Sequence, residues 1–146
     1  MSMFSMLEMS GSALSAERRR AEVVASNMAN ADTTNTPAGG PFRRKQVVFT
    51  SPSGSSFRFQ LASFQRLGRQ PEAVRLTQVV EDPTPPVLRY EPGHPDANKD
   101  GYVAYPAINP VAEMVDLMGA MRAYQLNASA VSASKQMIAQ ALDLLK

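Results

Sequence analysis

Hydrophobic residues at both ends of the chain recur at alternating spacings of three and four, the pattern of a helix that packs along one stripe. The C-terminal stripe consists of Met114, Leu117, Met121, Tyr124, Ala128, Val131, Lys135, Ile138, Leu142 and Leu145. Only Lys135 is neither apolar nor aromatic. Asn109 can cap the helix and Pro110 suits its first position. The pattern therefore predicts a long helix over residues 110–146.

The first 31 residues repeat this pattern. Their stripe consists of Met3, Leu7, Ser10, Leu14, Glu17, Ala21, Val24, Met28 and Ala31. An Asn-rich run and Pro37 should end this helix, because Pro lacks an N–H and clashes with the preceding turn. We expect the two stripes to pack together as an antiparallel coiled coil, with their large apolar members forming the seam. Lys135 would then need a carboxylate, for which Glu8 and Glu17 are the candidates.

Apolar residues also lie outside both stripes, and a two-helix ridge cannot cover them all. They include Phe4, Met6, Met9, Val23, Val111, Val115 and Met118. Such surface indicates burial by other chains. The alternative is that the middle segment folds back over it.

The middle of the chain has a different composition from its ends. All 11 prolines lie between Pro37 and Pro110. Alternation of apolar and polar residues predicts strands within 41–49, 57–64 and 74–80, whereas the prolines in 82–92 limit any strand there to an edge. The segment 93–106 is expected to form a turn that leads into the helix. The predicted fold class is α+β, divided into 1–34 (N-terminal helix), 35–108 (β-rich segment) and 109–146 (C-terminal helix).

Candidate chemistry is sparse. The chain has no cysteine and a single histidine, His94, which disfavours a transition-metal site. Asp96, Asn98 and Asp100 match the first half of a calcium loop, but Ala107 stands where the bidentate Glu belongs. An Asp/Asn/Gly turn, in which Gly101 takes a positive φ, explains this segment better. We expect no catalytic residues, no metal and no cofactor.

Charge gives little indication of a partner. The net charge is +2, and the basic clusters 18–20 and 43–45 lack interleaved aromatic residues, so neither nucleic acid nor a small-molecule substrate is expected. No apolar run approaches the roughly 20 residues that a membrane-spanning helix needs. The N-terminus has no basic leader of the secretory type.

The segment 12–49 resembles the N-terminal signature of the flagellar rod, hook and related axial proteins. Its core, S-N-x-A-N-x-x-T, is carried by Ser26, Asn27, Ala29, Asn30 and Thr33. The extension Gly39–Lys45 and the block over 82–137 are similar to the proximal-rod branch of that family.

The resemblance implies a structural subunit and not an enzyme. It implies that terminal helices pair around the rod's central channel and that the subunits polymerise helically into a shaft that transmits torque. It also implies type III export without a cleaved signal, a periplasmic location in the basal body, and contacts with other rod subunits and an export-gate adaptor. The alternative is a secreted coiled-coil adaptor with a calcium-stiffened turn.

Overall fold

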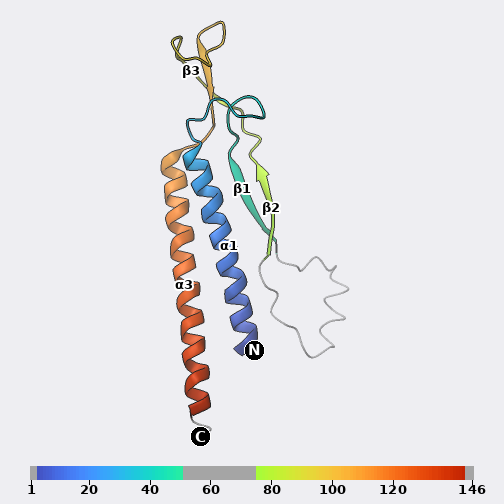
Figure 1. Cartoon of the computed structure of the whole chain (residues 1–146), viewed down its shortest axis with the longest axis vertical. Coiled ribbons are helices and arrows are strands. Elements are labelled where there is room, and N and C mark those ends of the chain that lie inside the picture. The colour runs from blue at the N-terminus through green and yellow to red at the C-terminus, as the bar shows by residue number, and fades with distance from the viewer. Residues whose placement is uncertain (1–2, 51–74, 144–146) are drawn as a thin grey trace, which may run out of the picture.

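The computed structural model describes residues 3–50 and 75–143. Within these residues, two long helices and two small antiparallel sheets form an α+β fold (Figure 1). The elements in order are α1 (Met3–Ala29), β1 (Lys45–Thr50), β2 (Arg75–Glu81), β3 (Val87–Tyr90), β4 (Tyr102–Tyr105) and α3 (Pro110–Asp143). None of the described helices is long and apolar enough to span a bilayer. The strand predicted over 57–64 and the seam residue Leu145 lie outside the described residues.

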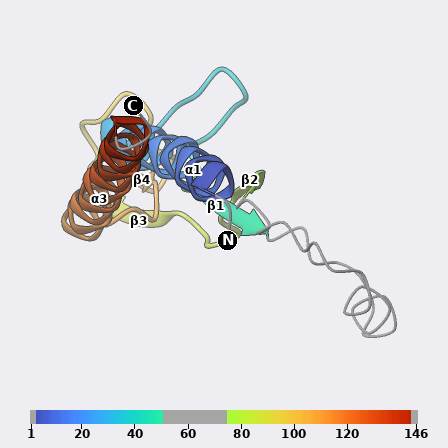
Figure 2. The ribbon, with the colours of Figure 1, turned by 90° about the horizontal axis from the view of Figure 1, so that it is seen from below.

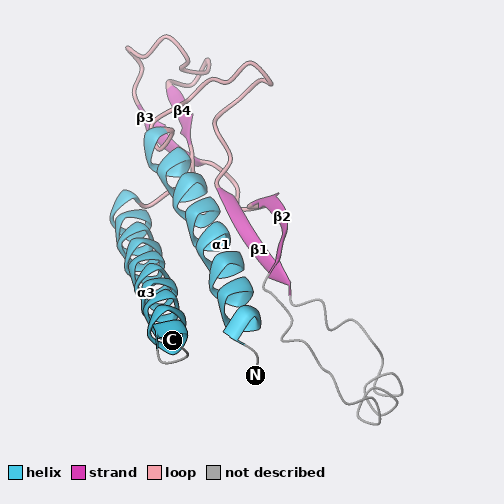
Figure 3. Cartoon of the chain, turned by 60° about the horizontal axis from the view of Figure 1, so that its bottom comes forward, coloured by secondary structure: helices cyan, strands magenta, loops and turns pink. Residues whose placement is uncertain are grey.

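The two helices lie side by side and run in opposite directions, so the ends of α1 and α3 that adjoin the sheets are near each other (Figures 1 and 3). Seen along the helices, α1 lies between α3 on one side and β1 with β2 on the other (Figure 2). α1 is therefore the central element, and its side chains must satisfy two neighbours.

The expected start of α3 is confirmed. The Asn109 side-chain oxygen accepts hydrogen bonds from the backbone N–H groups of Val111 and Ala112, at 3.0 and 3.3 Å. These are two of the N–H groups that a helix leaves without an internal partner. Pro110 occupies the first helical position.

Small and polar side chains fill the contact between the helices. The buried residues of α3 are Glu113, Ala120 and Ser134, which are seven or fourteen residues apart. The Ser134 hydroxyl donates to the sulfur of Met6 on α1 at 3.6 Å. The larger residues Leu117, Val131 and Ile138 of α3 are half-buried.

The predicted seam residues divide into three groups. Val24 is buried. Leu7, Leu14, Met28, Leu117, Val131 and Ile138 are half-buried. Met114, Met121, Tyr124 and Leu142 are exposed, because the buried positions Glu113 and Ala120 each stand one residue before a predicted one. Lys135 is also exposed, and no ion pair joins it to Glu8 or Glu17, all three being among the described residues.

The first sheet pairs β1 with β2, in register Lys45↔Glu81 and Val47↔Val79, with an irregularity between Val48 and Phe49. Both strands correspond to predicted ones. The sheet lies along α1, whose Val23 is buried.

The second sheet pairs β3 with β4. The proline-rich segment supplies β3, and every residue of that strand is exposed. The turn expected within 93–106 is present, but the segment also contains β4, whose Val103 and Tyr105 alternate into a buried face. The positive φ of Gly101 is confirmed at 80°.

Candidate functional site

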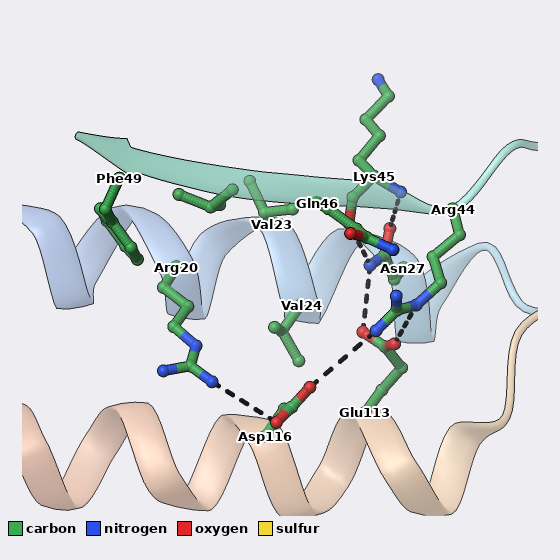
Figure 4. Close-up of a pocket in the computed structure, with 11 residues that line it drawn as sticks. Arg20, Val23, Val24, Asn27, Arg44, Lys45, Gln46, Phe49, Glu113 and Asp116 are labelled. Atoms are coloured by element: carbon green, nitrogen blue, oxygen red, sulfur yellow. Dashed lines mark hydrogen bonds and ion pairs between the residues drawn. The ribbon is translucent and has the colours of Figure 1, made fainter. Parts of the chain in front are cut away.

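A polar cluster joins α1, β1 and the first turns of α3 beside a cavity of about 340 Å³ (Figure 4). Asn27 lies at its centre and is 1% exposed. Its side-chain oxygen accepts from the Lys45 N–H at 2.9 Å, and its Nδ2 donates to the Lys45 carbonyl at 2.8 Å. The side chain of Asn27 thus pairs with the first residue of β1 as a neighbouring strand would.

The second proton of Asn27 Nδ2 is directed at α3. Nδ2 donates to Glu113 Oε2 at 3.0 Å, so the amide uses one acceptor and two donors. Asp has no donor to offer here and Ser is too short, which accounts for asparagine at this position. One side chain thereby joins three elements that are far apart in the sequence.

Glu113 is a buried carboxylate with a partner for each oxygen. Arg44 Nε donates to its Oε1 at 2.6 Å, while Asn27 serves its Oε2. Burying a carboxylate is costly unless it is paired and hydrogen-bonded, and both conditions hold. Arg44 therefore neutralises the only charge in the centre of the cluster.

An outer ring of charges surrounds this pair. Arg44 also lies 3.7 Å from Asp82 Oδ2 and 3.9 Å from Asp116 Oδ2, and Arg20 of α1 lies 3.5 Å from Asp116 Oδ1. Hydrogen bonds from the Thr84 hydroxyl and backbone N–H, with a smaller effect of Gln46 and Arg44, lower the pKa of Asp82 below its ordinary value. Asp82 is therefore held as a carboxylate at the end of β2.

The residues of the S-N-x-A-N-x-x-T motif end α1 and start the next turn. Asn30 Nδ2 donates to the Ser26 carbonyl at 2.8 Å, and the Thr33 hydroxyl donates to Asn30 Oδ1 at 3.2 Å. The Ser26 carbonyl also accepts from the Asn30 backbone N–H at 3.2 Å, so Asn30 caps the end of the helix through both its backbone and its side chain. Ala29 is exposed and makes no such contact.

The loop between β3 and β4 uses its acidic and amide oxygens internally. Asn98 Oδ1 accepts from the backbone N–H groups of Asp100 and Tyr102, each at 2.9 Å. Asp96 accepts from the Thr34 hydroxyl at 2.6 Å, which ties this loop to the segment after α1. Among the described residues, no group of three or more His, Cys, Asp and Glu side chains could hold a metal ion.

Sequence reasoning found Asn27 through its motif but missed Glu113, Arg44 and Asp82. Glu113 and Asp82 belong to no motif, and Arg44 was considered only as part of the basic cluster 43–45 and its possible contact with nucleic acid. A second row on the same helix could have indicated the buried face. It consists of Glu113, Ala120, Asn127 and Ser134, which recur every seven residues and lie one position before Met114, Met121, Ala128 and Lys135. Because this second row is small and polar, the hydrophobic pattern did not identify it.

Comparison with known proteins identifies the family of the chain. Residues 7–35 match the family described as "Flagella basal body rod protein", and residues 99–144 match "Flagellar basal body rod FlgEFG protein C-terminal". The chain is 40% identical to the flagellar basal-body rod protein FlgC of Bacillus subtilis over 151 residues, covering 100% of both chains. It is 39% identical to FlgC of Yersinia enterocolitica, covering 99% of this chain and 98% of that one, and 34% identical to FlgC of Borreliella burgdorferi.

The chain belongs to the FlgC family of flagellar basal-body rod proteins.

The two matched segments contain the two sides of the cluster. The first includes Asn27 of α1, and the second includes Glu113 of α3. Arg44 and Asp82 lie between these segments, in the part that only the full-length FlgC relatives cover. The cluster thus connects both halves of the family's helical part to the β strands of this chain.

Proposed function

We propose that this chain is a structural subunit of the proximal rod, which polymerises helically with copies of itself and other rod subunits. The resulting shaft would transmit motor torque and surround the export channel. The observation that carries this proposal is the Asn27–Glu113–Arg44 cluster, which joins two helices and a strand by buried hydrogen bonds and an ion pair. A subunit under torque needs such a joint, because load must pass from its helices to its β strands without slippage.

As part of this function, we propose that the seam residues form a coiled coil, some of them within the single chain and the rest only after subunits have assembled. Val24 is already buried in the single chain, and Leu117, Val131 and Ile138 are partly covered. Met114, Met121, Tyr124 and Leu142 would be covered by neighbouring subunits, as their exposure allows. The segments 1–34 and 109–146 would then form the helical core of the rod, and 35–108 its outer, β-rich part.

The proposed route and location follow from family membership. The chain would pass through the flagellar type III export apparatus without a cleaved signal and assemble in the periplasmic part of the basal body. An export-gate adaptor would be its contact at the base of the rod. The role is structural and not catalytic, in keeping with the names of its relatives, which are flagellar basal-body rod proteins.

Complementation tests this function. An epitope-tagged copy should restore motility to cells that lack the native protein and should co-purify with their basal bodies. Val131→Asp should leave secretion into the periplasm intact but abolish rod assembly, because it places a charge in the helix contact. Ser132→Asp, one residue further and exposed, is the matched control and should assemble normally. Absence of the tagged chain from purified basal bodies would contradict the proposal.

A further inference from the structure

The face of α3 that points away from α1 carries an apolar row with one cation in it. Val111, Val115, Met118 and Leu126 are each more than half exposed. They recur at helical spacing, and Arg122 stands in the same row between Met118 and Leu126. Arg122 is exposed and has no ion pair or hydrogen bond within the described part of the chain. We call these five residues the outer ridge.

A groove of about 490 Å³ runs between α1 and α3 on a different face of the helix pair. Ala21, Met121 and Tyr124 give it apolar walls, and Glu17 contributes a carboxylate. Arg18 also lines the groove, but its guanidinium is paired with Glu22 at 3.1 Å. The Oε2 atom of Glu17 is buried and has no hydrogen-bond partner among the residues that the structure describes. Buried polar atoms in proteins are nearly always hydrogen-bonded, so this oxygen is an acceptor in need of a donor.

The ridge and the groove carry complementary groups, since each has apolar side chains and one offers an unpaired cation where the other offers an unpaired carboxylate oxygen. An apolar helix face docks into an apolar groove through anchors at i, i+4 and i+7, which is the spacing of Val111, Val115 and Met118. A guanidinium is the donor best suited to a partly buried carboxylate. Resting on the proposed function, we infer that the outer ridge of one copy packs into the groove of a second copy, with Arg122 donating to Glu17.

A second copy is the occupant because the ridge and the groove lie on different faces of the same rigid helix pair. They cannot meet within one chain. Joined between chains, they form a heterologous contact that leaves a free ridge and a free groove at its two ends. Such a contact propagates and does not close on itself, as a rod requires. Lys135 is the other unpaired cation among the described residues of α3, but its row includes the half-buried Val131 and Ile138, which face inward.

Charge exchange in the full chain tests the contact. Glu17→Arg or Arg122→Glu alone should lower the number of assembled rods per cell roughly tenfold, because like charges then meet in the groove. The double variant Glu17→Arg with Arg122→Glu should restore most of the loss. Lys135→Glu should leave rod number unchanged. If the exchange rescues nothing, or if Lys135→Glu combined with Glu17→Arg rescues instead, the pairing is refuted.

Disulfide cross-linking gives a second readout that leaves Glu17 and Arg122 in place. Because the chain has no cysteine, Ala21→Cys with Met118→Cys introduces the only two thiols. Oxidised basal bodies should yield covalent dimers and longer ladders of this chain, whereas Glu8→Cys with Met118→Cys should not. Cross-linking to a different protein, or no product at all, would overturn the assignment of a second copy. Basal bodies from cells with the wild-type chain should be purified in parallel. If they contain the chain while the cysteine variants give no covalent dimer, the proposed contact has failed and the proposed rod function has not.

Discussion

Asn27→Asp is the sharpest test of the polar cluster, because it changes one NH2 group into an oxygen and leaves the shape intact. The hydrogen bond from the Lys45 N–H to the remaining side-chain oxygen survives. The Lys45 carbonyl and Glu113 Oε2 both lose their donor. Each buried acceptor left without a donor costs about 1–3 kcal/mol, so the expected loss is about 2–6 kcal/mol. Repulsion between two carboxylates acts in the same direction.

A second substitution should recover part of this loss. Glu113→Gln in the Asn27→Asp background removes the repulsion and presents an amide donor where Oε2 stood, while the remaining oxygen still accepts from Arg44. The double variant should therefore be more stable than Asn27→Asp alone, by about 1–3 kcal/mol. Glu113→Gln in the native background should itself be destabilising. The NH2 group of the glutamine would face either Asn27 Nδ2 or Arg44 Nε, and both of these groups are donors.

Urea unfolding of the purified full chain, followed by helical circular dichroism, measures these free energies. Gln136→Glu is the control, since it makes the same change from amide to carboxylate on an exposed face of α3 and should shift stability by less than about 0.5 kcal/mol. The reasoning is refuted if Asn27→Asp also stays within that range. It is equally refuted if the effects of the two cluster substitutions are simply additive, since coupling across a hydrogen bond must appear in the cycle.

Three further predictions follow from the same contacts. Arg44→Lys should destabilise the chain by about 2–4 kcal/mol in the same urea assay. An ammonium group cannot make the hydrogen bond to Glu113 and the contact with Asp82 at the same time. The control is Arg43→Lys at the exposed neighbouring position, which should leave stability unchanged. Gly101→Ala should lower the stability of the chain by about 1–2 kcal/mol, because the φ of Gly101 is 80° and a Cβ there would lie 2.9 Å from Tyr90 Cε2. The control is Gly93→Ala, whose Cβ would meet nothing within 4 Å. The NMR signals of the Tyr90 and Tyr102 rings report the change. The lowered pKa of Asp82 means that its ionised form stabilises the fold. This contribution is complete above the ordinary pKa of 3.8 and is lost as the pH falls through the lower folded-state pKa. Asp82→Asn should therefore make the free energy of unfolding fall less steeply below about pH 4, and an unchanged pH dependence there would contradict the argument.

The sequence alone determined the elements whose causes are local. Asn109 and Pro110 specify the start of α3 because a side-chain oxygen and a missing N–H act within one turn. Gly101 specifies a positive φ because other residues are strained there. Alternation of apolar and polar residues was enough to find β1 and β2, and two helical stripes were enough to find both helices. The order of motifs along the chain was enough to recognise its family.

The tertiary structure decided which face of each helix is buried and what holds the elements together. Rows one residue apart on α3 share the spacing of three and four, so periodicity cannot distinguish the stripe of Met114 from that of Glu113. In the folded chain the buried row is that of Glu113, Ala120 and Ser134. Likewise, nothing near Glu113 in the sequence identifies Asn27 or Arg44 as its partners, 86 and 69 residues away. Pairing of buried polar groups depends on three-dimensional contact, and only the folded chain brings those groups together.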